Sequence, residues 1–279
     1  MSTQSERRAA GIDTMRTLSG GKFDPERAAK AMVRRNGALG SFGMDHVLGT
    51  IWNRPALSRR DRSLIVVAFL ASQGEGAAEE LAFHAQGAVN HGLSREQVDE
   101  VVLQVAGYAG FPFAMAASRV VNEAWRSMDD VERLPPREEA QAKDDPERWA
   151  DSNEVRTLMF GGRNDPDPAR DRAAMSEALG AVGEMAFDFA FGELWSRDVL
   201  SRRDRSLVTV AILAMTSRLD ELRIHGRIAL NHGCTREELE EIMVQLTAYR
   251  GFPAAVEGAR TLRELFDRLD RRGAGSKAK

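Results

Sequence analysis

Apolar residues recur along the chain with the three-to-four-residue spacing of amphipathic helices. In the segment that follows Ser94 these apolar positions are Val98, Val101, Val102 and Val105. Ser94 with Gln97 forms a capping pair that opens this segment, and the segment that follows Thr235 repeats the whole arrangement. We see no segment that alternates apolar and polar residues as a half-buried strand does. The pattern therefore predicts an all-α protein.

The chain contains one long sequence twice. The string LSRRDRSL occurs at 57–64 and again at 200–207, an offset of 143 residues. Residues 79–114 match residues 220–255 at 16 of 36 aligned positions, at an offset of 141. The first copy therefore has two extra residues between these blocks. A repeat of this length indicates duplication of a whole domain.

Shorter matches extend the repeat toward the N-terminus. They pair Arg16-Thr17-Leu18 with Arg156-Thr157-Leu158, Asp24-Pro25 with Asp165-Pro166, and Trp52 with Trp195. The chain is thus expected to divide into a first repeat (1–128), a charged Pro-containing linker (129–153), a second repeat (154–270) and a disordered tail (271–279). We expect two tandem helical domains related by a pseudo-twofold axis, with Glu80 over Glu221 and His84 over His225.

Composition and charge narrow the class of protein. The net charge of −3 argues against a dedicated nucleic-acid binder, which needs a basic surface. No apolar run approaches the roughly 20 residues of a membrane helix, and the N-terminus has no hydrophobic signal region. We therefore expect a cytoplasmic protein with neither a membrane nor a nucleic-acid partner. The single cysteine, Cys234, excludes an internal disulfide, a CxxC pair and a cysteine-based zinc site.

Four of the five histidines stand at matching places in the two repeats. On the expected helix 79–91, Glu80, His84 and His91 share one polar stripe. The second repeat has the same stripe: Glu221, His225 and His232. A carboxylate one turn from an imidazole orients the ring and favours its protonated form, as an acid–base pair requires. An ion pair on a solvated helix face is the simpler interpretation, and repetition alone does not exclude it.

Other polar residues are candidates for substrate binding. His91 and His232 each precede a glycine at an expected helix C-terminus, where capping by a cationic ring competes with a role in catalysis. The only tyrosines, Tyr108 and Tyr249, either donate to a substrate anion or lie in the core. Two arginines of LSRRDRSL can bind a substrate carboxylate in a forked geometry: Arg62 and Arg205. Arginines of this kind are more often solvated or paired with nearby acidic side chains. A Glu and two His spaced four and seven apart span about 16 Å of helix, too far for one metal ion.

Taken together, these motifs resemble the carboxymuconolactone decarboxylase family of the alkylhydroperoxidase D-like superfamily. The matching motifs are L-S-x-R-x-R, E-L-x-x-H, A-x-N-x-G and Q-x-x-x-Y-x-G-F-P, over roughly residues 45–125 and 188–266. The resemblance implies an all-helical fold that associates into rings, so we expect a homo-oligomer, a trimer of tandem chains.

The resemblance also implies chemistry: loss of CO₂ from a small cyclic carboxylate like 4-carboxymuconolactone, without metal or organic cofactor. The implied catalytic pairs are Glu80 with His84 and Glu221 with His225, and the implied substrate-binding residues are Arg62, Arg205, His91, His232, Tyr108 and Tyr249. In the first site, Glu80 and His84 are expected to supply a proton to carbon while Arg62 or Tyr108 holds anionic oxygens.

The peroxidase branch of the superfamily carries a CxxC pair, which this chain lacks. The two thiols would fall at Ala77 and Glu80 in the first repeat and at Arg218 and Glu221 in the second. Thiol peroxidase activity of that kind is therefore disfavoured, and Cys234 alone has no resolving partner. A non-catalytic ring-forming scaffold, a small-ligand binder and a divergent enzyme of another pathway stay open as alternatives.

Overall fold

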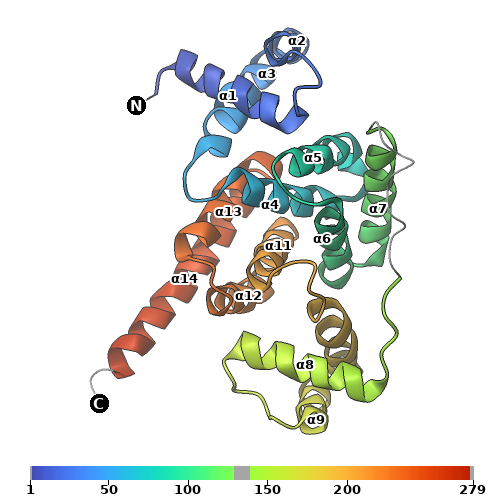
Figure 1. The fold of residues 1–279 in the computed structure, drawn as a ribbon. Helices are drawn as coiled ribbons and strands as arrows, with labels where there is room; N and C mark the ends of the chain where they lie inside the picture. The colour runs from blue at the N-terminus through green and yellow to red at the C-terminus, as the bar shows by residue number, and fades with distance from the viewer. Residues whose placement is uncertain (1, 129–138, 277–279) are drawn as a thin grey trace.

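The computed structural model describes residues 2–128 and 139–276, and every regular element in them is a helix (Figure 1). The first repeat consists of α1 (Gln4–Ser19), α2 (Pro25–Asn36), α3 (Ala38–Phe42), the π-helix η1 (Gly43–Leu48), the 3₁₀ turn η2 (Ile51–Asn53), α4 (Arg59–Ala71), the 3₁₀ turn η3 (Gly74–Ala77), α5 (Ala78–Asn90), α6 (Arg95–Tyr108) and α7 (Phe111–Arg126).

The second repeat has the same order of main helices. It consists of α8 (Asp145–Phe160), α9 (Pro168–Leu179), α10 (Ala181–Met185), the π-helix η5 (Ala186–Trp195), α11 (Arg202–Met215), α12 (Leu219–Asn231), α13 (Arg236–Tyr249) and α14 (Phe252–Ser276). The two extra residues of the first repeat are absorbed by η3, since α12 follows α11 after a short turn.

Part of the expected linker is helical. Residues 129–138 lie outside the described structure, but α8 begins at Asp145 because Asp144 and Glu147 form a capping box and Pro146 is tolerated in the first turn. At the other end, α14 continues to Ser276, so the part of the expected disordered tail up to that residue is helical. Residues 277–279 lie outside the described structure.

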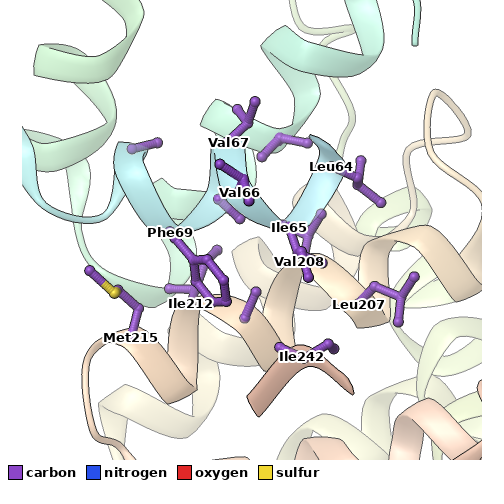
Figure 2. Close-up of a cluster of buried hydrophobic side chains, with 14 of the residues drawn as sticks. Leu64, Ile65, Val66, Val67, Phe69, Leu207, Val208, Ile212, Met215 and Ile242 are labelled. Atoms are coloured by element: carbon purple, nitrogen blue, oxygen red, sulfur yellow. The ribbon is translucent and has the colours of Figure 1, made fainter. Parts of the chain in front are cut away.

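The core lies between α4 and α11, the two helices that begin in the repeated LSRRDRSL string. Every residue of α4 from Asp61 to Ala71 is buried, as is every residue of α11 from Asp204 to Met215. Figure 2 shows Phe69 of α4 beside Ile212 of α11. A helix that is apolar on all sides must be covered on all sides, which is why these two helices pack on each other at the centre.

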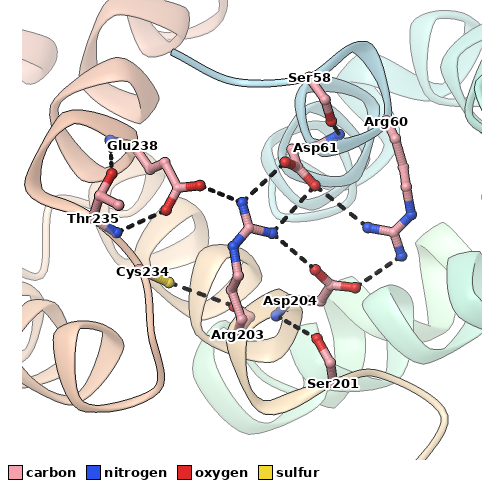
Figure 3. Close-up of polar contacts among 9 residues, drawn as sticks. All are labelled: Ser58, Arg60, Asp61, Ser201, Arg203, Asp204, Cys234, Thr235 and Glu238. Carbon is pink, nitrogen blue, oxygen red and sulfur yellow. Dashed lines mark hydrogen bonds and ion pairs between the residues drawn. The ribbon is translucent and has the colours of Figure 1, made fainter.

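Reciprocal ion pairs join the two copies of the repeated string (Figure 3). Arg60 binds Asp204 at 2.8 Å, and Arg203 binds Asp61 at 3.0 Å. The serine before each helix accepts a hydrogen bond from the amide of the same aspartate, which leaves the carboxylate free for the other repeat. Contacts in which each repeat uses the same residues on the other are the signature of a twofold relation.

The structure corrects two of the short upstream matches. The N-cap Asp24, followed by Pro25, has its counterpart in Asp167 with Pro168 rather than in Asp165 with Pro166. Likewise Leu18 corresponds to Met159, because their carbonyls accept equivalent hydrogen bonds at 2.7 Å. The donors are the side chains of Asn90 and Asn231. The match between Arg16-Thr17-Leu18 and Arg156-Thr157-Leu158 is therefore one residue out of register.

Among the described helices, none combines the length and the apolar character that crossing a bilayer requires.

Candidate functional site

His84 lies in a closed aromatic cluster. Its ring stacks on Trp52 at a centroid distance of 5.6 Å and an interplanar angle of 15°. The edges of Tyr249 and Phe83 meet it at 5.9 and 5.4 Å. The indole N–H of Trp52 donates to the Tyr249 hydroxyl at 3.2 Å. The His84 side chain is only 8% exposed, and its Nδ1 is buried without a hydrogen-bond partner.

This cluster is composite, because Tyr249 belongs to the second repeat and His84 to the first. The equivalent arrangement surrounds His225, whose ring stacks on Trp195 at 6.1 Å and meets the edge of Tyr108 at 5.1 Å. Trp195 donates to the Tyr108 hydroxyl at 2.7 Å. His225 also has a buried Nδ1 with no hydrogen-bond partner.

The expectation that Tyr108 assists His84 is therefore wrong, since Tyr108 lies at the other histidine. The physical reason is the packing of the helices that carry the tyrosines. The helix α6, which ends at Tyr108, packs against α11 and η5 of the other repeat. The helix α13, which ends at Tyr249, packs against α4 and η2 in the same way.

Arg62 is fully buried and holds the helix that carries Tyr249. Its guanidinium donates to Gln245 and Glu241 at 2.8 Å each, and to the backbone carbonyl of Arg54 at 2.7 Å. The second copy uses Arg205 with Gln104, Glu100 and the carbonyl of Arg197, at 2.8–2.9 Å. Both guanidinium groups are already bound to carboxylates of the opposite repeat. In this structure they therefore hold in place the helices that carry Tyr249 and Tyr108.

His91 and His232 cap their helices in different surroundings. The Nδ1 of His91 is hydrogen-bonded to Ser63 at 2.7 Å and its Nε2 to Thr17 at 2.9 Å. His232 keeps only the first kind of contact, with Ser206 at 2.8 Å, and its Nε2 is buried without a partner. In the corrected register, Leu158 stands where the first repeat has Thr17. This exchange accounts for the missing hydrogen bond.

Glu80 and Glu221 lie at the surface. Both are exposed, in the first turns of α5 and α12, where a carboxylate interacts favourably with the helix dipole. Each is one turn from its histidine, but within the described residues no hydrogen bond joins Glu80 to His84 or Glu221 to His225. The polar stripe thus runs from solvent at the glutamate to the interior at the histidine.

Burial decides the charge of the histidines. Desolvation lowers the pKa of His84 to about 3, with a smaller effect from His91. It lowers the pKa of His225 to about 4, with a smaller effect from His232. The pKa of His91 and of His232 also falls to about 4, mainly through burial. All four rings are therefore neutral at pH 7, so the expected capping by a cationic ring does not occur.

A comparison with known protein families decides the relationship. The sequence profile of the "Carboxymuconolactone decarboxylase family" matches residues 39–123 and again residues 180–264. One match falls in each repeat, and together they make up more than half of the chain. The chain belongs to the carboxymuconolactone decarboxylase family.

Curated members of this family resemble single repeats of the chain. The 4-carboxymuconolactone decarboxylase of Acinetobacter baylyi is 35% identical over 125 residues, which are 45% of this chain and 91% of that protein. Nitrosuccinic acid decarboxylase npaB of Metarhizium robertsii is 37% identical over 82 residues, which are 29% of this chain and 56% of that protein. The chain therefore spans about half the length of the second relative.

In this family member the single thiol is inert. Cys234 is buried, its Sγ lies 3.7 Å from the carbonyl oxygen of Arg203, and burial raises its pKa to about 12. A thiol that stays protonated is a poor nucleophile. Within residues 2–128 and 139–276, no three His, Cys, Asp or Glu side chains gather as metal ligands do.

Several residues of the candidate site were missed from the sequence. Trp52 and Trp195 served only as markers of the repeat, yet they stack on the candidate histidines. Gln104 and Gln245 are part of the Q-x-x-x-Y motif and lie one helical turn before each tyrosine. The available signal was their recurrence at matching positions in both repeats. That signal indicates a shared role without giving the contact across the repeats.

Proposed function

We propose that this protein is a cofactor-independent decarboxylase of a small cyclic carboxylate, like 4-carboxymuconolactone, with His84 and His225 as its acid–base residues. The observation that carries the proposal is the composite cluster itself. In both copies an imidazole whose Nδ1 is buried without a hydrogen-bond partner lies between a tryptophan of its own repeat and a tyrosine of the other. Membership of a family with two decarboxylases among the relatives supports this chemistry.

The low pKa of each histidine suits a proton donor that is charged only with substrate bound. Desolvation by the protein keeps the ring neutral, whereas a bound carboxylate would supply the opposite charge and raise the pKa of the ring. As the C–CO₂ bond breaks, its electron pair moves through the ring double bond to the lactone carbonyl and gives a dienolate. The imidazolium then transfers its proton to carbon and returns to neutral imidazole.

The proton must be replaced from solvent in each cycle. We propose Glu80 and Glu221 for this step, since each is an exposed carboxylate one turn from its buried ring. Tyr249 and Tyr108 keep their protons, because burial raises the pKa of both hydroxyls. A neutral phenol at this place is a hydrogen-bond donor for the developing enolate oxygen. The side chains of the two clusters would be held in position by His91, His232, Arg62 and Arg205.

The two sites differ in access, and we propose that the second site carries more of the turnover. His84 is closed by Phe83, whereas the counterpart of Phe83 is Ile224, whose side chain is 53% exposed. His225 is accordingly only partly buried, while His84 is buried. His225 is therefore the more exposed of the two candidate proton donors.

The test is CO₂ release and loss of lactone absorbance with 4-carboxymuconolactone, run with a chelator present. His225→Gln should reduce kcat by about 10²- to 10⁴-fold, the usual cost of removing an acid–base group. His84→Gln should retain most activity, and the double variant should have none. The control is His46→Gln, which changes the one exposed histidine outside both clusters.

Wild-type turnover by the double variant would show that the histidines are structural. Glu80→Gln with Glu221→Gln should lower kcat without changing KM if these residues relay the proton. An unchanged kcat would leave them only the role of stabilising the helix N-termini.

A further inference from the structure

A strongly basic cavity lies in the second repeat, away from both aromatic clusters. Its volume is about 700 Å³, and its lining is formed by Arg163, Arg223, Arg227, Leu265, Arg268, Leu269 and Arg272. Arg163 follows α8, while the other residues come from facing turns of α12 and α14. We propose that this cavity is a binding site for a small polyanion that carries several carboxylate or phosphate groups.

The first argument is uncompensated charge. Asp220 lies 2.8 Å from Arg223, and Glu264 lies 3.8 Å from Arg223 and 4.0 Å from Arg268. Among the described residues, no ion pair forms at the other three arginines of the lining. Five arginines thus line one cavity, and two carboxylates pair with two of them. The positive charge that is left attracts anions.

The second argument is unused hydrogen-bonding capacity. The Nε atoms of both Arg223 and Arg227 are buried and have no hydrogen-bond partner. Buried donors normally find an acceptor, so these two N–H groups on one face of α12 are available to an oxygen-rich ligand. Arginine presents a planar fork that matches carboxylate and phosphate oxygens, and the two leucines at the wall accommodate an apolar part of such a ligand.

The third argument is the contrast with the first repeat, which has the same helices and no such cavity lining. At the positions of Arg223, Arg227 and Arg268 it has Ala82, Gln86 and Ser127. There Gln86 bridges the two helices by donating to the carbonyl of Ala124 at 3.1 Å and to Ser127 at 2.9 Å. The arginines of α12 and α14 are therefore a feature of the second repeat, whereas Arg163 has a basic counterpart in Lys22. The helix α14 supplies its arginines beyond the position where α7 ends.

The cavity is separate from the proposed decarboxylase site. Arg223 and Arg227 stand two residues before and after His225, which places them about 160° around α12 from it. Anion binding there does not depend on the proposed reaction, and a failed activity assay leaves this proposal intact.

Isothermal titration calorimetry of the full chain with citrate and, separately, with pyrophosphate tests the proposal, with chloride holding the ionic strength constant. We expect saturable binding of one anion per chain, and the two titrations distinguish a carboxylate ligand from a phosphate ligand. Arg163→Gln with Arg227→Gln should weaken the binding at least tenfold. The second substitution copies the residue that the first repeat uses.

The matched control is Arg34→Gln with Arg35→Gln, which removes two exposed charges from α2 and should leave the affinity unchanged. His225→Gln should also bind normally. Equal loss in the cavity variant and in the α2 control would overturn the proposal, because it would indicate only a response to net charge. Absence of saturable binding by either anion would overturn it as well.

Discussion

At the scale of single residues, the histidines couple the site to the stability of the protein. Burial places the pKa of His84 near 3 and that of His225 near 4, against 6.5 for the ordinary side chain. The unfolded chain therefore binds protons at these residues below pH 6.5, while the folded chain does not. Folding is favoured above pH 6.5, and this contribution is lost as the pH falls toward the folded-state pKa values.

We expect the free energy of unfolding to fall between pH 6.5 and pH 5 by roughly 1–2 kcal/mol for each of His84 and His225. Urea titrations across this window measure the loss. In His84→Gln with His225→Gln the dependence on pH should be markedly weaker, because glutamine does not titrate. The window stays above the ordinary pKa of carboxylates, so acid titration of Asp and Glu contributes little. Identical slopes in the variant and the wild type would contradict the assigned burial.

The sequence predicted which helices carry the site residues better than it predicted which residues contact one another. Helical spacing correctly placed His84 on α5, and the repeat correctly paired it with His225. The same spacing placed Glu80 beside the ring, yet the glutamate lies in solvent and the histidine lies in the core. A helical projection gives the direction of a side chain from its axis, whereas burial depends on what packs there. Here the neighbour is Trp52, which sequence alone did not assign to the site.

At the scale of elements, buried ion pairs fasten α4 to α13 and α11 to α6. Arg62 and Glu241 are 0% and 2% exposed, and their side chains approach to 2.8 Å. A buried charge that loses its partner keeps the full cost of desolvation. The stability of this contact therefore depends on both charges being present.

Glu241→Gln should lower the free energy of unfolding by about 3–5 kcal/mol, because Arg62 would remain buried without a carboxylate. Denaturant titration measures the change. The control is Glu75→Gln, which breaks an ion pair with Arg119 in which the side chains are 83% and 65% exposed. That change should cost less than about 1 kcal/mol. Similar losses in both variants would refute the importance of burial.

Element boundaries show why short matches mislead. The capping pattern correctly predicted the start of α6, where Ser94 and Gln97 form the expected box. The upstream three-residue and two-residue matches gave wrong registers, because strings this short recur by chance. The hydrogen bonds to Leu18 and Met159 fix the correspondence of α1 with α8, and the N-caps Asp24 and Asp167 fix that of α2 with α9. Residues 1–40 had no assigned role, and α1 proves to pack on η1 and α5 beside the first site.

At the scale of the whole molecule, the composite sites make the repeats interdependent. Each histidine cluster takes its tyrosine from the other repeat. Residues 1–128 or 139–279 expressed alone should therefore lack turnover and expose the apolar face of α4 or α11. Mixing the two halves should restore part of the activity through the contacts of Figures 2 and 3. Full activity of either half as a monomer would contradict the composite site.

The repeats also expose apolar residues at matching places on α3 and α10. Leu39 and Phe42 are 74% and 67% exposed, and their counterparts Val182 and Met185 are 72% and 59% exposed. Exposed apolar patches at matching places are typical of subunit interfaces. We propose that these patches form the contacts between chains in a trimer of tandem chains.

Multi-angle light scattering at micromolar concentration should give about three times the chain mass of 30.8 kDa. Phe42→Glu with Met185→Glu should reduce the mass toward that of one chain, since it places charge on both patches. The exchange Arg34→Glu with Arg35→Glu adds the same kind of charge beside the first patch and serves as the control. A wild-type mass near 30.8 kDa would refute the assembly.

The exchange of tyrosines between repeats has a consequence for evolution. After an ordinary gene duplication, one copy is free to accumulate substitutions while the other maintains the activity. Here a substitution at Tyr108 removes a ring contact of His225, and a substitution at Tyr249 removes a ring contact of His84. Selection for a single working pocket therefore protects parts of both halves. Even if one pocket loses its activity, selection must maintain its half of the gene, because that half still supplies the tyrosine of the other pocket.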